Sequence, residues 1–453
     1  MQPLPKEFEE QMKRLLGEAG FFAYLDALNQ PYTRALRVNL LLRPDGTPPC
    51  PIEGLGAPVP WARGAYFVEG DARPGLSPLH EGGLFYMQEP SALTAVTALD
   101  PQPGERVLDL CAAPGGKSTQ IAALMAGHGL LCCNEPIPSR AQILSRNIER
   151  MGVRNAVVLS AMPDALAPRF PAFFDRILVD APCSGEGMFR RQPEARDEWD
   201  ADAPRRCADR QMEILAQAAK MLRPGGTMVY STCTFNDTEN EGVLRRFLAL
   251  HPEFSLVPFA LPGLPEAKDG YLHLYPHEMR GEGHFVSRLK KADGADGADA
   301  PVQAAPQRKA PARAAAKGKA PAPIALPDVF SDAFAPERLY TAGDALWMLP
   351  EGISIERLSG LRVLRTGLLL AHAEGKRSEP DHALAMALRP EEAARTASLT
   401  QTQALAYQAG ETLSLGDLPG GYTLLCCEGV SLGWGKQAGG LMKNHYPKGL
   451  RRR

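Results

Sequence analysis

Short apolar runs alternate with amphipathic stretches between residues 81 and 291, and this alternation restricts the fold more than any other feature of the sequence. Six runs are typical of buried strands, and they cover 106–110, 130–134, 156–160, 175–180, 227–232 and 284–289. Four stretches with helical periodicity lie between them, at 117–126, 138–151, 204–222 and 237–250. Strands that alternate with helices form a parallel sheet covered on both faces. The sequence therefore predicts an α/β domain with a doubly wound sheet.

The sequence changes character on either side of this domain. A helical stretch at 8–28 and a strand-like run at 37–42 precede it. A stretch rich in Ala, Pro, Gly and Lys follows it, and such a composition is typical of a flexible linker. Two further strand-like runs, 361–370 and 421–426, then mark a globular module. The predicted organisation is an N-terminal extension, a sheet domain, a linker and a C-terminal, partly β module, with the bounds 1–80, 81–291, 292–324 and 325–453.

The composition is that of an ordinary globular protein, with 44% apolar and 23% charged residues. The first residues are polar and acidic, unlike a signal peptide, and no apolar run approaches the roughly 18 residues of a membrane-spanning helix. The nine cysteines include no C-x-x-C pair, which argues against a zinc site and against a secreted disulfide framework. We therefore expect a cytoplasmic monomer with reduced thiols, no metal and no membrane contact.

Basic side chains cluster locally, although the net charge is only −2. One cluster runs along the predicted helix at 138–151 and its exit: Arg140, Arg146, Arg150 and Arg154. A second follows the strand at 175–180: Arg190, Arg191, Arg196, Arg205, Arg206 and Arg210. Further basic residues lie in the tail 448–453 and in the linker, at Arg308, Lys309, Arg313, Lys317 and Lys319. Such patches can bind nucleic acid on a near-neutral protein, whereas solvated helix faces would explain them without a partner.

A turn of small residues follows the first strand of the sheet domain. It comprises Cys111, Ala112, Ala113, Pro114, Gly115, Gly116 and Lys117. Small side chains let the backbone approach a ligand at a helix N-terminus. The turn is neither a phosphate loop nor G-x-G-x-x-G, which disfavours a nicotinamide dehydrogenase and favours a nucleotide-like ligand without phosphates, such as S-adenosylmethionine. Glu135, which follows the second strand, is placed to accept both ribose hydroxyls of such a ligand, although a plain surface acid is the alternative.

Two cysteines, Cys183 and Cys233, each lie just past the end of a predicted strand. Ligands of open α/β sheets bind at the carboxyl ends of the strands, so we expect both thiols at the ligand-binding edge. Two thiols at such an edge suggest covalent catalysis, in which one sulfur attacks and the other handles a proton. The other cysteines are expected to be small packing residues, as free cysteines usually are: Cys50, Cys111, Cys132, Cys133, Cys207, Cys426 and Cys427.

A set of short motifs runs through the predicted sheet domain: Y-M-Q-E-P-S-A-L (86–93), D-L-C-A-A-P-G-G-K (109–117), D-A-P-C-S-G-E-G-M-F-R (180–190), L-R-P-G-G…Y-S-T-C-T (222–234) and G-H-F-V-S-R-L (283–289). Together they resemble the Sun/Fmu family of RNA 5-methylcytosine methyltransferases over about residues 1–291. Two later motifs, L-R-T-G-L-L-L (364–370) and E-P-D-H-A-L-A (379–385), are similar to the RsmF-type branch, which methylates 16S ribosomal RNA.

The resemblance implies a Rossmann-like methyltransferase sheet that uses S-adenosylmethionine to methylate carbon 5 of cytosine, with 16S ribosomal RNA as the expected substrate. It places the methyl donor on the turn 111–117, on Glu135 and on Asp180. The acid that usually follows the third strand is absent here or displaced to Asp164. The resemblance also implies RNA contacts from the N-terminal extension and a PUA-type RNA-binding fold for the C-terminal module. A folding cap with a basic tail is the competing interpretation of that module.

The family assigns the attack on carbon 6 of the base to the cysteine of the T-C motif, here Cys233. It implicates the cysteine of the P-C motif, here Cys183, in product release as a base or a relay, and Asp180 is placed to hydrogen-bond the edge of the base. A base inside structured RNA must be unstacked or flipped, and the candidates to stack on it are Phe189, Tyr230 and Phe235, with packing in the core as the alternative for each. The candidates for an electropositive setting around the thiols are Lys117, Arg190 and Arg191.

Two alternatives remain open. The chain could be a transfer RNA cytosine methyltransferase of the same family, or an RNA-binding assembly factor whose methyltransferase domain is vestigial. The joint presence of Glu135, Asp180, Cys183 and Cys233 argues against the vestigial domain.

Overall fold

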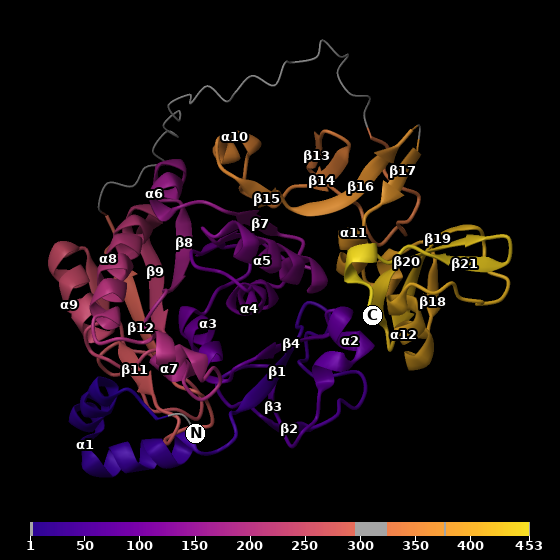
Figure 1. The fold of residues 1–453 in the computed structure, drawn as a ribbon. Coiled ribbons are helices and arrows are strands. Elements are labelled where there is room, and N and C mark those ends of the chain that lie inside the picture. The colour runs from indigo at the N-terminus through magenta and orange to yellow at the C-terminus, as the bar shows by residue number, and fades with distance from the viewer. Residues whose placement is uncertain (1–2, 295–323, 376, 453) are drawn as a thin grey trace.

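The computed structural model describes residues 3–294, 324–375 and 377–452, and the strands in these ranges form four sheets (Figure 1). The largest sheet has nine strands in the order β10-β12-β9-β8-β5-β6-β7-β15, and β11 pairs with β12. Its five central strands are parallel: β5 (Arg106–Asp109), β6 (Leu130–Asn134), β7 (Ala156–Leu159), β8 (Phe174–Asp180) and β9 (Leu222–Thr232). The antiparallel members are β10 (Phe254–Leu256), β11 (Tyr271–Leu274), β12 (His284–Lys291) and β15 (Val363–Arg365). All six predicted strands are present in this sheet.

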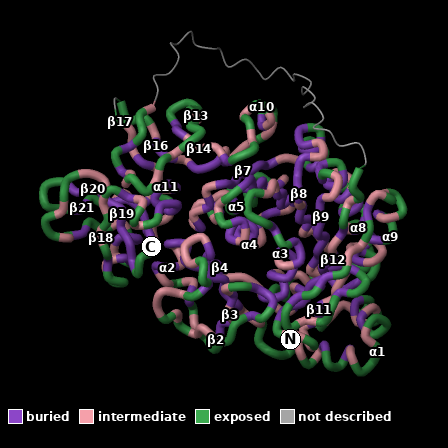
Figure 2. Tube along the Cα trace, turned by 180° about the vertical axis from the view of Figure 1, so that it is seen from behind, coloured by how far each residue is buried: buried purple, intermediate pink, exposed green. Residues whose placement is uncertain are grey.

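Helices cover both faces of the sheet, as the alternation predicts (Figures 1 and 2). One face carries α3 (Thr94–Leu99), α4 (Gly116–Leu124) and α5 (Pro138–Arg150). The other carries α6 (Pro163–Leu166), α8 (Ala203–Met221) and α9 (Glu241–Leu250). Cys132 and Cys133 are fully buried in the two opposite cores, because successive strand residues point to opposite faces. The doubly wound α/β architecture is therefore confirmed.

The N-terminal extension consists of a long helix and a separate small sheet. The helix α1 (Lys6–Leu28) packs Phe8 and Tyr24 against Phe189 and Phe235 of the sheet domain. The small sheet has the order β2-β3-β1-β4, with the bounds β1 (Arg34–Val38), β2 (Leu55–Pro58), β3 (Ala65–Val68) and β4 (Phe85–Gln88). It extends past the predicted boundary at residue 80. The predicted strand 37–42 is displaced, because the chain turns directly after Val38.

The C-terminal region holds two sheets rather than the single predicted module. One contains β13 (Leu339–Ala342), β14 (Ala345–Met348), β16 (Leu368–Glu374) and β17 (Arg377–Pro380). The other contains β18 (Thr396–Ser398), β19 (Gly421–Cys427), β20 (Val430–Ala438) and β21 (Leu441–Asn444). The predicted strand 361–370 breaks at Gly367, whose φ of 139° separates β16 from β15 on the central sheet. The region therefore contributes one strand, β15, to the sheet of the central domain.

The last sheet also shares a core with the N-terminal sheet. Leu36 and Phe85 of the N-terminal sheet join Leu425 and Leu432 of β19 and β20 in one buried cluster. Gln408 donates to the carbonyl oxygen of Pro78 at 3.0 Å, both within this interface. Burial of this shared surface joins the first and last parts of the chain.

The remaining helical segments are short connections. The α-helices are α2 (Pro78–Glu81), α7 (Glu194–Glu198), α10 (Ile355–Leu358), α11 (His382–Ala387) and α12 (Gln401–Ala409). The 3-10 turns are η1 (Pro74–Leu76), η2 (Ser91–Leu93), η3 (Ala167–Arg169), η4 (Glu186–Met188), η5 (Pro390–Glu392) and η6 (Lys448–Leu450). Among the described residues, no helix is both long and apolar enough to cross a membrane. The predicted linker and its five basic residues fall almost entirely in 295–323, outside the described residues.

Candidate active site

The glycine turn after β5 can receive a ligand because it leaves no room for side chains. Gly115 has a φ of 112°, and a Cβ on it would lie 3.2 Å from Leu144 Cδ1. A Cβ on Gly116 would lie 3.2 Å from Tyr86 Cε1 and 3.4 Å from Gln88 Cδ. The two glycines therefore let the turn fit between α5 and the N-terminal sheet while its backbone faces the carboxyl edge of the sheet.

The end of β6 supplies a buried carboxylate beside this turn. Glu135 is only 3% exposed, and its Oε1 accepts a hydrogen bond from the backbone N–H of Ile137 at 3.0 Å. Arg140 Nη1 lies 3.6 Å from the other carboxylate oxygen of Glu135 and forms an ion pair with it. The alternative of a plain surface acid is wrong for Glu135. Asp164, the displaced candidate, lies exposed in the first turn of α6 after β7.

A second carboxyl group in this region lacks a full set of partners. Asp109 is fully buried at the end of β5, and Ser118 donates to its Oδ2 at 2.6 Å, whereas Oδ1 has no hydrogen-bond partner among the described residues. Burial raises the pKa of Asp109 to about 7. A glycine cradle, the buried Glu135 and this unpaired acceptor form a polar, close-fitting site, and these residues fit a nucleoside-type methyl donor.

The two key thiols meet at the same edge of the sheet. Adjacent parallel strands β8 and β9 end together, with Asp180 opposite Ser231, and their following residues place Cys183 Sγ 3.3 Å from Cys233 Sγ. This separation is a hydrogen-bonding contact and is much longer than the roughly 2.05 Å of a disulfide bond. The sequence prediction that both thiols lie at the ligand-binding edge is thus realised as direct contact, and both are partly accessible.

Backbone contacts hold the two cysteine loops together. The N–H of Gly187 donates to the carbonyl oxygen of Cys233 at 2.8 Å. A Cβ on Gly187 would lie only 2.9 Å from that oxygen, so a side chain at this position would push the loops apart. The G-E-G sequence after Cys183 therefore serves the thiol contact.

Two buried glutamates reinforce this pairing, and the sequence analysis did not identify them. Glu239 accepts hydrogen bonds from the backbone N–H of Ser184 (3.0 Å), the Ser184 hydroxyl, Gln211 Nε2 (2.8 Å) and Asn236 Nδ2 (2.8 Å). Glu186 accepts from the backbone N–H of Phe235 at 2.8 Å. Each glutamate joins the residues after Cys183 to those after Cys233. The signal in the sequence was two glutamates within six residues of the thiols.

Asp180 is held as an anion between a lysine, a serine and a histidine. Lys117 Nζ lies 2.7 Å from Asp180 Oδ2, and the Ser231 hydroxyl donates to Oδ1 at 2.8 Å. Burial opposes the charge, but Lys117 outweighs it, and the pKa of Asp180 is lowered from its usual range. Burial likewise opposes the charge of Lys117, yet Asp180 and the Cys233 sulfur nearby raise the pKa of this lysine. Both groups are therefore ionised at neutral pH.

His284 is a further side chain of this site that the sequence analysis passed over. It begins β12, is 3% exposed, and places Nε2 3.6 Å from Asp180 Oδ1. Burial and the neighbouring Lys117 lower the pKa of His284, so the imidazole is neutral. Only its position in the 283–289 motif marked it in the sequence.

The surroundings of Cys183 favour its protonated form. The hydrogen bond to Cys233 and then burial raise the pKa of Cys183 well above the ordinary value of a thiol. Cys183 therefore keeps its proton at neutral pH and shares a hydrogen bond with Cys233 Sγ. Burial, followed by the charge of Asp109, also raises the pKa of Cys111, as expected of a packing residue.

The aromatic candidates for base stacking are wrong. Phe189, Tyr230 and Phe235 are at most 1% exposed. The two phenylalanines pack under α1, and the Tyr230 hydroxyl donates to the Glu239 carbonyl oxygen at 2.6 Å. Their position next to the thiols in sequence reflects the core beneath the site, so none of them can reach a bound base.

Several arginines of the predicted patches serve the fold. Arg190 lies 2.7 Å from Glu282 and does not face the thiols, so of the three basic candidates Lys117 is the one placed at the site. Arg150 donates to the carbonyl oxygen of Phe85 at 3.2 Å, and Arg154 to Glu392 at 3.0 Å, so both join parts of the chain. Local patterning could not show this, because the partners lie far away in sequence.

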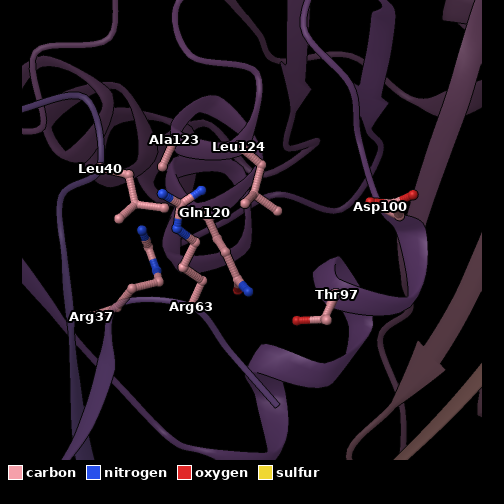
Figure 3. A pocket seen from close by; sticks show the side chains of 8 residues that line it. All are labelled: Arg37, Leu40, Arg63, Thr97, Asp100, Gln120, Ala123 and Leu124. Atoms are coloured by element: carbon pink, nitrogen blue, oxygen red, sulfur yellow. The ribbon is translucent and has the colours of Figure 1, made fainter. Parts of the chain in front are cut away.

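A small cavity of about 120 Å³ lies on the far side of α4 from the thiols. Figure 3 shows Arg37, Arg63 and Gln120 pointing into it. Arg37 also donates to Thr119 Oγ1 at 2.8 Å and to the Gly116 carbonyl oxygen at 3.3 Å, which ties β1 to the glycine turn. The volume of the cavity suits a few water molecules, and neither thiol lines it.

Comparison with known proteins places these features in one family. The family model described as 16S rRNA methyltransferase RsmB/F matches residues 96–290. Three further models match the flanking parts: the N-terminal domain of 16S rRNA methyltransferase RsmF (4–90), the RsmF rRNA methyltransferase first C-terminal domain (327–388) and the methyltransferase RsmF PUA domain (394–452). Ribosomal RNA small subunit methyltransferase F of Erwinia tasmaniensis is 33% identical over 98% of this chain and 96% of its own. The chain belongs to the RsmB/F family. The predicted family and the predicted methyltransferase activity are thus confirmed.

Solved structures agree with this RsmB/F assignment. The methyltransferase homolog protein from Pyrococcus horikoshii is 30% identical, with a TM-score of 0.54 over 63% of this chain and 95% of its own. NSun6 from Pyrococcus horikoshii, solved with SFG, has a TM-score of 0.55 over 64% of this chain and 99% of its own, at 22% identity. The NSun6 likeness supports the fold alone. The family models also divide the C-terminal region where its two sheets divide.

Proposed function

We propose that this RsmB/F-family chain methylates carbon 5 of cytosine in 16S ribosomal RNA, with S-adenosylmethionine as methyl donor and Cys233 as nucleophile. One observation carries the proposal: Cys183 Sγ lies 3.3 Å from Cys233 Sγ at the edge where the glycine turn and the Lys117–Asp180 pair also lie. A methyl transfer to oxygen or nitrogen needs no thiol. Two thiols in contact beside a donor site therefore suit carbon methylation.

Carbon 5 of cytosine is too weak a nucleophile to take a methyl group unaided. The Cys233 thiolate forms a bond to carbon 6, and the displaced electron pair of the ring moves to carbon 5, which then forms the new carbon–carbon bond. Carbon 5 next loses its proton, the carbon 6–sulfur bond breaks, and the double bond of the ring returns. The covalent adduct divides one difficult step into easier ones. S-adenosylmethionine supplies the electrophilic methyl group when it is bound.

Cys183 changes its properties during this sequence. In the free protein the hydrogen bond with Cys233 is the largest cause that raises the pKa of Cys183, followed by burial. Once Cys233 is bonded to carbon 6, its sulfur carries no charge and this cause disappears. Cys183, which is partly accessible, then gives its own proton to solvent, and its thiolate accepts the proton of carbon 5 as the carbon 6–sulfur bond breaks. The change supports Cys183 as a relay that becomes active only after the adduct has formed.

Lys117 and Asp180 form one ion pair beside the thiols and contribute opposite charges at the reacting edge. Lys117 lies close enough to the Cys233 sulfur for that sulfur to raise the pKa of the lysine, so the ammonium group is placed to stabilise a thiolate as it attacks. Asp180 is ionised and so accepts hydrogen bonds, which suits it to the amino group or to a protonated nitrogen 3 of the base rather than to proton donation. The donor would be held by the turn 111–117 and by Glu135, while Asp164 stays a prediction.

The choice of 16S ribosomal RNA follows the family and its relatives, whose names specify the small ribosomal subunit. The test is bisulfite sequencing of ribosomal and transfer RNA from a strain that lacks the gene. We expect one or more 5-methylcytosines of 16S RNA to disappear and to return with the wild-type gene but not with Cys233→Ala. Loss confined to transfer RNA would instead identify the other member of the class. Unchanged RNA in both pools would overturn the proposal. Cytoplasmic location and a monomeric state stay predictions.

A further inference from the structure

We infer that a groove of about 330 Å³ beside the active site binds the phosphate backbone of the single-stranded RNA that flanks the target cytosine. This inference rests on the proposed function, because it names the part of the substrate that the groove receives. The groove lies where the N-terminal sheet meets the loop that follows Cys183. It is called the arginine groove here, and its polar lining includes Arg34, Arg73, Gln88, Glu89 and Arg191.

The three arginines come from separate segments and converge on one surface. Arg34 lies on β1, Arg73 directly precedes η1, and Arg191 follows the P-C cysteine by eight residues. Such convergence is set by the fold, since local sequence clustering does not produce it. Three like charges around one hollow repel one another unless an anion lies between them, and a phosphodiester is such an anion.

The charges of the arginine groove are available to a ligand. Arg73 and Arg191 are exposed, and neither has a carboxylate partner within the described parts of the chain. Arg34 donates to the carbonyl oxygens of Gly70 and Ala72, so it is fixed in place and still uncompensated. The groove's one acid, Glu89, is already occupied by the backbone N–H groups of Ser91, Ala92 and Glu282. The lining is therefore positive on balance.

The arginine groove is continuous with the active site through Gln88. Its side-chain amide lies within 3.5 Å of the position a Cβ would take on Gly116 of the donor turn. Its Oε1 is buried and has no hydrogen-bond partner among the described residues, so it can accept from a hydroxyl group such as that of a ribose. Glu89, the next residue, accepts a hydrogen bond from the backbone N–H of Glu282. The Glu282 carboxylate in turn pairs with Arg190, the neighbour of Arg191. An RNA strand bound in the arginine groove would therefore run close to the two thiols.

Two further features favour RNA over an isolated anion. Tyr32 and Leu76 on the rim are 47% and 66% exposed, which offers a ring face and an apolar surface to an unstacked base. Arg452 of the C-terminal tail donates to the carbonyl oxygens of Leu76 at 2.5 Å and Ser77 at 3.0 Å, so it brings another cation to the rim. The target base must leave its stack to react, and a base in a single-stranded segment can do so without breaking a base pair.

The test replaces the two exposed arginines, as Arg73→Gln with Arg191→Gln, and leaves Arg34 because it supports the backbone. Arg245→Gln is the control: this exposed arginine lies on α9, which is packed on the opposite side of the central sheet. Binding of a 16S RNA transcript is measured against salt concentration, and methyl transfer is measured for KM and kcat. Binding of S-adenosylmethionine is measured separately.

We expect the double variant to lower the salt slope of RNA binding by about 1.4 and to raise KM for RNA about tenfold, since each lost phosphate contact contributes about 0.7 to the slope. Donor binding and kcat at saturating RNA stay close to wild type, and the Arg→Lys pair restores the slope. An unchanged slope and KM in an active protein would overturn the arginine groove. A wild-type protein that methylates no RNA would instead overturn the proposed function, so the two failures are distinct. A raised KM with an unchanged slope would also count against phosphate contacts.

Discussion

Glu239→Gln is the change that tests most sharply whether the thiol pair depends on its buried support. The Glu239 carboxylate is fully buried and accepts four hydrogen bonds that join the loop of Cys183 to the loop of Cys233. An amide of the same shape keeps one acceptor oxygen and turns N–H groups toward the remaining donors. The Ser184 hydroxyl can rotate and accept from that amide, whereas Asn236 Nδ2 stays committed to its other partners.

The size of the effect follows from these contacts. Hydrogen bonds to a charged acceptor contribute about 1.5–3 kcal/mol each, and one to two of the four are lost. Burial raises the pKa of Glu239, which means that burying its charge is unfavourable. The neutral amide avoids this desolvation cost and so offsets part of the lost hydrogen bonding. The free energy of unfolding should fall by about 2 kcal/mol in total. Glu213→Gln, on the exposed face of the same α8 helix that carries Gln211, should change it by less than about 0.5 kcal/mol.

A second readout separates positioning from plain stability. The charge of Glu239 is one of the causes that raise the pKa of Cys183, after the Cys233 hydrogen bond and burial. Glu239→Gln should therefore shift the pH profile of product release to lower pH, measured by the decay of the covalent RNA adduct. Urea unfolding gives the stability. A lower stability with an unmoved pH profile would leave Glu239 a structural residue, and no change in either would refute the reasoning.

Three further changes give separate tests. Cys183→Ala should trap a covalent protein–RNA adduct, visible as a shifted band on a denaturing gel, and the absence of that band would remove the release role of Cys183. Gly187→Ala should place a Cβ 2.9 Å from the Cys233 carbonyl oxygen, a backbone atom that cannot rotate away. The free energy of unfolding should therefore fall by about 1–3 kcal/mol, as measured by urea unfolding. Asp180→Asn removes a carboxylate whose pKa is lowered in the folded state, so the wild type should be more stable than the variant above about pH 4. That advantage should disappear as the pH falls through the lowered pKa, and a pH-independent difference would contradict the Lys117–Asp180 pairing.

The structure also changes which truncation is informative. Removal of residues 325–453 was the natural test of an independent RNA-binding module. The last sheet shares its core with the N-terminal sheet, and β15 completes the central sheet beside β7. Such a deletion would expose Leu36 and Phe85 and would disturb RNA binding and donor binding together. Point changes at exposed residues are therefore the better probes.

Much of the fold was predictable because its signals are local. Burial on both faces gives each parallel strand an apolar run, and the helices between them carry an apolar stripe, so six strands and four helices could be located from the sequence. The carboxyl ends of those strands fixed the edge on which Cys183, Cys233 and the turn 111–117 lie. Errors arose where local patterns served distant contacts, as at Gly367, where one apparent strand is divided between two sheets.

The sequence by itself determined the doubly wound sheet, the family, and the residue types at the reacting edge, because periodicity and motif spacing are properties of neighbouring residues. Only the tertiary structure decided that the two sulfurs touch, that Glu186 and Glu239 hold them, and that Phe189 and Arg190 belong to the interior. It also decided which arginines, such as Arg73 and Arg191, stay exposed without a carboxylate partner among the described residues. These outcomes depend on contacts between segments that lie tens to hundreds of residues apart, such as Arg190 with Glu282 and Arg452 with Leu76. Packing and charge pairing act across such distances, and no local pattern records them.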